Sequence, residues 1–252
     1  MKKILVTYHA NQELDYEQVV FERLEFYAKK CNAKFIKVDL SEEVKNSNHP
    51  QKYSLEKYFK INELKEEEFD RALIIDTDVM VRKDSPDIFE LSENKLCVFN
   101  EGCSFINYKE PNREIEEIQK RYANIYELIK ECKLESLELP KTIGFKEGCF
   151  EYFNFGVQVL SKSHLNIFDV NEDLKEKLRS CAVYGPDQAY FNYLIQKEKI
   201  ETYSLPNCFN QMISTFKYNY LDTSYFVHYA GFADQRMKFV EEDNKIWEKR
   251  GI

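Results

Sequence analysis

Apolar residues occur along the chain in short runs and at helical spacing, and the order of these patterns predicts an α/β fold. Residues 3–8 are rich in Ile, Leu and Val and alternate little, which is typical of a strand buried on both faces. Between residues 12 and 31, apolar side chains recur at helical spacing, and residues 34–40 read as a second strand. A strand, a helix and a strand in this order predict a parallel sheet with a right-handed crossover.

The rest of the chain continues this pattern. Further strands are predicted at residues 71–75, 79–81, 96–100, 153–160 and 226–229. Helices are predicted at residues 55–64, 112–133 and 187–196, with a loop at 46–52 and a charged helical tail at 233–252. The helix at 112–133 either covers the core or is an insertion that shapes an acceptor site. We expect one domain over residues 1–252.

Composition and charge narrow the class of protein. Apolar residues make up 43% and aromatic residues 15% of the 252 positions, so a sizeable core is expected rather than a disordered chain. The formal net charge is −8 and no basic face is visible, which argues against nucleic acid as a partner. The first apolar run stops at Val6, too early for a signal peptide, and no later run could span a membrane. A cytoplasmic protein is expected, with peripheral membrane contact left open.

Seven cysteines occur at positions 31, 97, 103, 132, 149, 181 and 208. Their number is odd and no CxxC pair is present, which fits neither a zinc ribbon nor a disulfide framework. We expect reduced and mostly buried thiols.

The candidate chemistry lies at Asp76-Thr77-Asp78, directly after the apolar run at residues 71–75. Ligands of α/β proteins bind where the carboxyl ends of strands meet, so these carboxylates are well placed for a site. Two carboxylates at i and i+2 on an extended chain point to opposite faces, so one cation requires a turn here. Carboxylate oxygens suit Mg²⁺ and Mn²⁺, which also bind diphosphates. The alternative is that the three residues form only a turn or a helix cap.

The segment around this motif, FDRALIIDTDVMV at residues 69–81, resembles the "YDRVLYLDADVLV" segment of nucleotide-sugar glycosyltransferases with the GT-A fold. The likeness is greatest to glycosyltransferase family 8, which includes glycogenin and bacterial galactosyltransferases. Other segments follow in that family's order: YFNFGV at 152–157, GPDQ at 185–188, LPNCFN at 205–210 and HYAG at 228–231. The resemblance implies a Rossmann-like GT-A domain, with a mixed, mainly parallel sheet and helices on both faces.

The resemblance also implies roles for individual residues. Asp76, Asp78 and His228 would bind Mn²⁺, with Mg²⁺ as the alternative, whereas His228 judged alone would be a core or surface histidine. Asp187 and Gln188 would lie near the anomeric carbon, although they also suit a helix N-cap. Donor contacts would come from Thr7, Tyr8, Asp76, Thr77 and Asn154.

The chain departs from the family pattern in two places. The family's HxxGxxKPW motif carries a lysine on the donor diphosphate, but Phe232, Ala233 and Asp234 follow Gly231 here. Arg236 or Lys238 would replace that lysine, unless both belong to a solvated helix face. The first strand ends in Thr7, Tyr8 and His9 rather than in the usual nucleotide-reading pattern, so the resemblance supports metal binding more than uracil recognition.

The resemblance implies that a hexose passes from a UDP-sugar to a hydroxyl of a glycan or glycoconjugate, with retention of anomeric configuration and a role in polysaccharide synthesis. Two alternatives stay open: an inverting enzyme with Asp187 as general base, and a noncatalytic nucleotide-sugar-binding protein. A nucleotidyltransferase would be expected to carry a glycine-rich phosphate loop, and the chain has only seven glycines.

Overall fold

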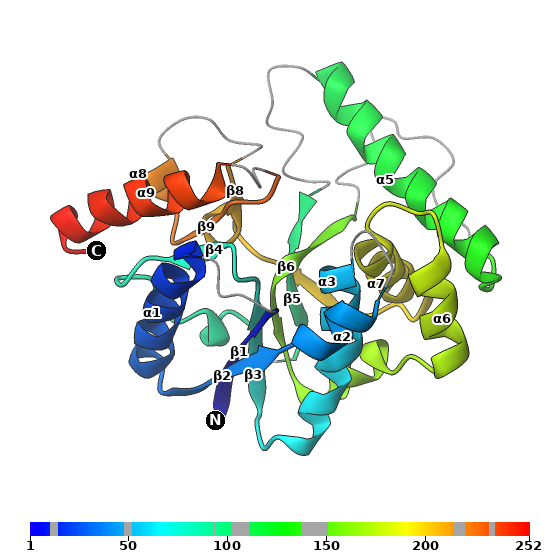
Figure 1. Ribbon diagram of the computed structural model, residues 1–252, viewed down its shortest axis with the longest axis horizontal. Helices are drawn as coiled ribbons and strands as arrows, with labels where there is room; N and C mark the ends of the chain where they lie inside the picture. Colours follow the sequence, from blue (N-terminus) through cyan, green and yellow to red (C-terminus); the bar gives the residue numbers. More distant parts are fainter. Residues whose placement is uncertain are drawn as a thin grey trace.

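The computed structural model describes residues 1–10, 15–47, 52–92, 94–101, 111–137, 151–213, 220–231 and 235–252. A central sheet lies between two groups of helices, with a small second sheet at one end of its strands (Figure 1). The predicted α/β class, with helices on both faces of the sheet, is therefore confirmed.

The central sheet has six strands, in the order β2 (Ala33–Asp39), β1 (Lys3–His9), β3 (Arg71–Ile75), β6 (Phe153–Leu160), β5 (Leu96–Asn100) and β7 (Thr202–Ser204). The pairs β2–β1, β1–β3 and β5–β7 are parallel. Strand β6 is antiparallel to both of its neighbours, β3 and β5. The sheet is therefore mixed and mainly parallel, as predicted.

Alternate residues of β1 supply two separate cores. Ile4, Val6 and Tyr8 pack in one apolar cluster, and Leu5 packs in the other. This alternation follows from the two-residue period of a strand, and it shows that β1 is buried on both faces. The first cluster includes side chains of α3 (Lys52–Lys60), α5 (Pro111–Cys132), α6 (Glu172–Ser180) and α7 (Pro186–Lys197). The second includes side chains of α1 (Asp15–Lys30) and α9 (Arg236–Arg250).

A second sheet of three strands, β4 (Val79–Val81), β9 (Phe226–His228) and β8 (Gln211–Met212), begins just beyond the carboxyl end of β3. Strands β4 and β9 are antiparallel, and Val79 pairs with His228. This pairing carries a residue from near the C-terminus to the end of β3. The two sheets therefore meet at the Asp76–Asp78 turn.

Several predicted elements differ in detail from the observed ones. The predicted helix at 55–64 is α3 followed by a 3-10 helix, Ile61–Glu66. A short helix, α2 (Ser41–Asn46), was not expected before the predicted loop, of which residues 48–51 lie outside the described residues. The elements α6, β7, β8 and α8 (Tyr220–Thr223) were also missed, because they are short or mostly polar.

The expectation of free and mostly buried cysteines is met where the structure describes the chain. Cys31, Cys97, Cys132 and Cys181 are free and buried, and Cys208 is free and half-buried. Cys103 and Cys149 lie outside the described residues. Within the described ranges, no helix combines the length and the apolar character that a membrane crossing needs.

Candidate metal and donor site

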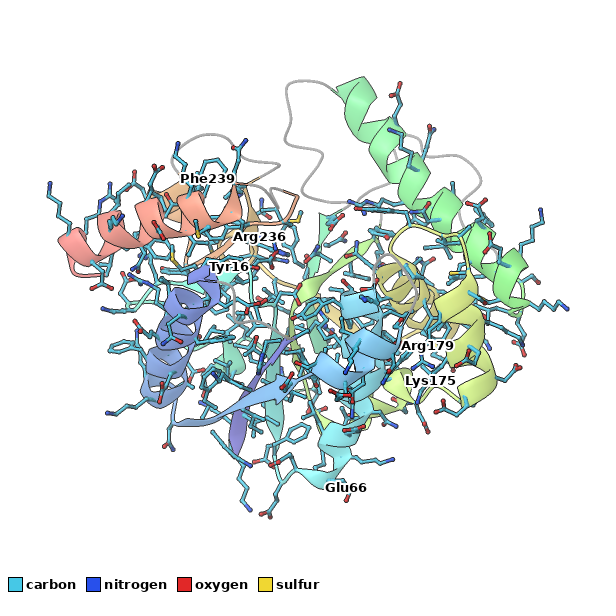
Figure 2. The ribbon with its side chains drawn as sticks, viewed as in Figure 1. Tyr16, Glu66, Lys175, Arg179, Arg236 and Phe239 are labelled. Carbon is cyan, nitrogen blue, oxygen red and sulfur yellow. The ribbon has the colours of Figure 1, made fainter. Side chains whose placement is uncertain are left out.

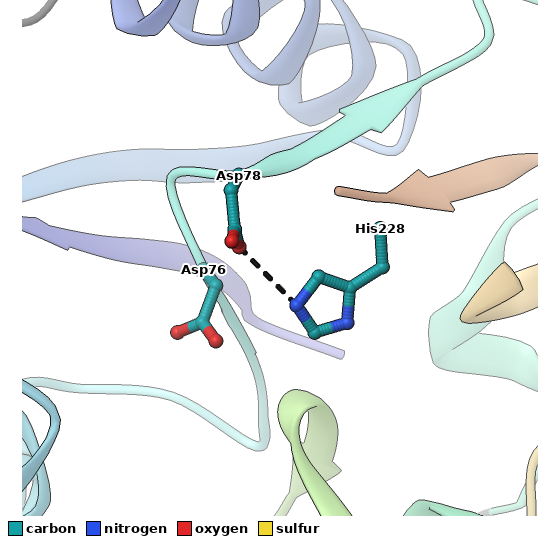
Figure 3. A group of neighbouring side chains, drawn as sticks. All are labelled: Asp76, Asp78 and His228. Carbon is teal, nitrogen blue, oxygen red and sulfur yellow. Dashed lines mark ion pairs between the residues drawn. The ribbon is translucent and has the colours of Figure 1, made fainter. Parts of the chain in front are cut away.

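A turn after β3 places Asp76 and Asp78 on the same side of the chain. The Asp76 N–H donates to Gly156 O at 2.9 Å, and the Val79 N–H donates back to Asp76 O at 3.2 Å. The Tyr229 N–H binds the carbonyl oxygen of Asp78 at 2.9 Å. Backbone contacts with β6 and β9 thus hold the turn. Figure 3 shows Asp76, Asp78 and His228 beside it, with the Asp78 carboxylate facing the His228 ring.

Asp76, Asp78 and His228 each offer one ligand atom, and these atoms lie within 4.8 Å of one another. His228 Nε2 is 3.2 Å from an Asp78 carboxylate oxygen, and both side chains are largely buried. Burial works against both charges, but the two groups stabilise each other. Asp78 raises the pKa of His228 despite the burial. His228, Arg236 and Lys57 hold the pKa of Asp78 at about 2, although burial alone would raise it.

The ring of His228 packs directly against Gly156 of β6. A Cβ atom at position 156 would lie 2.4 Å from His228 Cε1 and 3.0 Å from its Nδ1. Such distances are not tolerated, so any side chain at this position would displace the ring. The glycine of the YFNFGV segment is therefore explained by the position of the histidine.

Lys57 of α3 is a site residue that the sequence did not reveal. Its Nζ lies 2.5 Å from Asp76 Oδ1, and its side chain is only 2% exposed. The same nitrogen donates to Phe155 O at 3.3 Å and lies 4.2 Å from the centroid of the Phe155 ring. Lysine is common on exposed helix faces, so only its place beside apolar positions could have suggested a buried role.

The two cations proposed to replace the missing lysine lie in different surroundings. Arg236 Nη2 is 3.1 Å from Asp78 Oδ2, and the guanidinium also donates to Tyr229 O and to the Tyr16 hydroxyl, each at 3.2 Å. Figure 2 shows Arg236 and Tyr16 at the adjoining starts of α9 and α1. The Lys238 side chain is 71% exposed, with Glu242 at 4.0 Å. Of these two cations, Arg236 is the one that contacts the predicted ligand Asp78.

Asp187 and Gln188 lie in the first turn of α7, after Gly185 with a left-handed φ of 66°. Asp187 is buried, and burial raises its pKa to about 6 although Lys57 favours its ionised form. Gln188 Oε1 accepts from the Phe155 N–H at 3.3 Å. This hydrogen bond connects the N-terminus of α7 to β6, next to the Asp76–Asp78 turn.

The remaining predicted donor contacts are deeply buried. The Thr7 hydroxyl donates to Ile75 O at 2.9 Å, and the Tyr8 and Thr77 side chains are also buried.

Asn154 Oδ1 accepts from the Gly156 N–H at 2.8 Å and from Asn210 Nδ2 at 2.9 Å. The structure therefore brings these residues close to the acidic turn, while their roles toward a donor stay predictions.

No protein-family model matches the sequence, and a search of curated proteins finds no match. Solved structures do match over almost the whole chain. A glycosyltransferase involved in the glycosylation of the major capsid of PBCV-1 has a TM-score of 0.58 at 16% identity, covering 96% of this chain and 100% of its own. The galactosyltransferase LgtC, solved with donor and acceptor sugar analogues, has a TM-score of 0.58 at 16% identity, with 97% and 95% covered.

Mouse xyloside xylosyltransferase 1 matches with a TM-score of 0.50 at 12% identity, covering 92% of this chain and 98% of its own. These likenesses, together with the observed sheet, show that the chain has the GT-A fold of glycosyltransferases.

Proposed function

We propose that the protein is a metal-dependent glycosyltransferase that moves a hexose from a nucleoside diphosphate sugar, a UDP-sugar above all, to a hydroxyl of a glycan or glycoconjugate. The observation that supports this most is the convergence of Asp76, Asp78 and His228 at the end of β3. The GT-A fold gives the proposal its context.

The three side chains fit a divalent cation. Two carboxylates and one imidazole suit Mn²⁺ better than Mg²⁺, which prefers oxygen ligands alone. His228 Nδ1 contacts Asn210 Oδ1 at 2.8 Å, which leaves Nε2 facing Asp78 and the ligand cluster. When bound, the cation would neutralise charge on the departing nucleoside diphosphate.

Among the residues that the structure describes, Arg236 is well placed to bind the donor diphosphate. Its guanidinium already lies against Asp78, within the cluster that would bind the metal. Arginine forms two parallel hydrogen bonds to phosphate oxygens, so it would replace the family's lysine with a different geometry. The noncatalytic alternative rested on the missing lysine, and an arginine that binds the diphosphate would argue against it.

Asp187 and Gln188 would lie by the anomeric carbon, with the acceptor entering on the side of α7 and α5. Asn124 of α5 donates to Tyr184 O at 3.0 Å, three residues before Asp187, so α5 adjoins this side (Figure 1). We favour retention, as the family resemblance implies. The raised pKa of Asp187 supports an inverting mechanism as the second candidate, because a carboxylate with a pKa near 6 is a competent general base at neutral pH.

A thermal-shift panel of nucleotide sugars with and without Mn²⁺ tests the donor and the metal together. A ligand at about 100 times its dissociation constant stabilises a protein by about 2.7 kcal/mol. We expect UDP-sugars to raise the melting temperature only when Mn²⁺ is present. Stabilisation in EDTA, or none by any nucleotide sugar, would contradict the proposal. NMR coupling constants of the product anomer then separate retention from inversion.

A further inference from the structure

A chain of buried polar side chains leads from the candidate metal ligand His228 into the interior. His228 Nδ1 contacts Asn210 Oδ1 at 2.8 Å, and Asn210 Nδ2 donates to Asn154 Oδ1 at 2.9 Å. Asn154 Nδ2 then donates to Glu101 Oε1 at 2.8 Å. All four residues are buried, so they cannot exchange these partners for bulk water.

One backbone group determines which atom donates and which accepts in each hydrogen bond of this series of side chains. The Gly156 N–H can only donate, and it donates to Asn154 Oδ1 at 2.8 Å. The other end of the Asn154 amide must therefore be its NH₂ group, which faces the Glu101 carboxylate. Because Asn154 presents its oxygen to Asn210, Asn210 must present its own NH₂ group there.

The Asn210 oxygen is then the only end of that amide left for His228. An amide oxygen accepts hydrogen bonds, so His228 must carry a hydrogen on Nδ1 and donate it. Nε2 faces Asp78, and a bound cation would replace the proton on this nitrogen and take its lone pair. The tautomer that a metal site needs is thus set by residues that touch no metal.

We infer that Asn210 is a positioning residue that fixes His228 as a metal ligand through the Nδ1–H···Oδ1 bond. Partners of this kind orient the ring and typically account for about 10–100-fold in metal affinity. The inference rests on the metal site of the proposed function. Its rival is a purely structural role, in which the amides only satisfy one another in a buried place.

Two substitutions at one position separate these roles. Asn210→Leu has a similar size but cannot accept from Nδ1. Asn210→Asp can accept, but it buries a charge and turns an oxygen toward Asn154 Oδ1, so it should destabilise the fold more than the leucine does. A positioning role therefore predicts that Asn210→Asp, although less stable, binds the metal more tightly than Asn210→Leu does.

The readout is the dissociation constant of Mn²⁺ alone, measured at fixed pH from the EPR signal of free Mn²⁺, with melting temperatures measured in parallel. We expect Asn210→Leu to weaken binding by about 10–100-fold and Asn210→Asp to stay within a few-fold of wild type. Wild-type affinity in Asn210→Leu, or equal losses in both variants, would overturn the inference. If Asn210→Asp does not fold, the same comparison is made with Asn154→Leu and Asn154→Asp, because Asn154 is the next residue in the series of hydrogen bonds.

His228→Ala distinguishes failure of this inference from failure of the metal site itself. If His228→Ala binds Mn²⁺ as the wild type does, the proposed site is wrong and the inference is overturned with it. If His228→Ala loses Mn²⁺ while Asn210→Leu retains it, the site stands and only the role of Asn210 is refuted.

Discussion

Lys57 Nζ lies 2.5 Å from Asp76 Oδ1, so a buried ammonium group contacts a predicted metal ligand. The two residues come from different elements, α3 and the turn after β3, and the side chain of Lys57 is buried. The lysine offsets the negative charge that Asp76 and Asp78 place in one turn. It therefore competes electrostatically with any cation that these carboxylates bind.

Replacing Lys57 with methionine removes this competing charge and keeps most of the side-chain volume. We expect Lys57→Met to bind Mn²⁺ alone about tenfold more tightly, a gain of ~1.4 kcal/mol, because two charges this close interact strongly even at an effective dielectric constant of about 20. Isothermal titration with MnCl₂ measures the effect. Lys60→Met, on the same helix but paired with Glu43 and Glu63 at the surface, is the matched control. Weaker binding in Lys57→Met would show that the lysine instead orients Asp76.

Arg236 and Lys238 give a paired test of diphosphate binding. With Mn²⁺ saturating, Arg236→Ala should weaken UDP binding by ~1.5–3 kcal/mol, or roughly 10–150-fold, because a charged hydrogen bond to phosphate is lost. Lys238→Ala should leave the affinity unchanged, because its side chain is 71% exposed and lies beside Glu242. Titrations with uridine serve as the control, since uridine has no phosphate. If Arg236→Ala binds UDP as the wild type does, the C-terminal helix takes no part in donor recognition.

Asp187 should make the stability of the protein depend on pH in an unusual direction. Burial raises its pKa from 3.8 to about 6, so the folded state binds this proton more tightly than the unfolded state does. The resulting stabilisation is present below pH 3.8 and is lost as pH rises through 6. Above pH 6, the ionised Asp187 lowers the free energy of unfolding by about 3 kcal/mol relative to its value at low pH.

Asp187→Asn should therefore be more stable than wild type at pH 8 by up to about 3 kcal/mol, and similar to it near pH 4. Urea denaturation at both pH values measures the difference. Asp173→Asn, an exposed aspartate of α6 paired with Lys177, should show no such gain at pH 8. Equal or lower stability of Asp187→Asn at pH 8 would mean that the carboxylate is ionised in the fold without this cost.

Much of the fold could be read from the sequence, because buried strands are marked by local apolar runs. The predicted bounds of β3, β5 and β6 match the structure, and the turn required between Asp76 and Asp78 is observed. The direction of β6 could not be predicted, since apolar periodicity is the same in parallel and antiparallel strands.

The side chains around the candidate ligands were harder to predict. Lys57 and Asp76 are 19 positions apart, and Asn210 and His228 are 18 apart, so neither contact leaves a local pattern. Asn210 lies within the LPNCFN segment, but no pattern in that segment predicts a contact between its amide and His228. Only the packing of β6, β8 and β9 brings its amide to the histidine.

We expect glycosyl transfer to depend on a cation bound by Asp76, Asp78 and His228. The most direct test is the rate of UDP release from the UDP-sugar selected by thermal shift, compared between wild type and Asp78→Asn with Mn²⁺ and with EDTA. We expect EDTA to abolish release, Mn²⁺ to restore it better than Ca²⁺, and Asp78→Asn to reduce it by roughly 10²–10³-fold while its circular dichroism stays that of a folded protein. Undiminished release of UDP in EDTA, or by Asp78→Asn, would contradict a role of this metal site in glycosyl transfer.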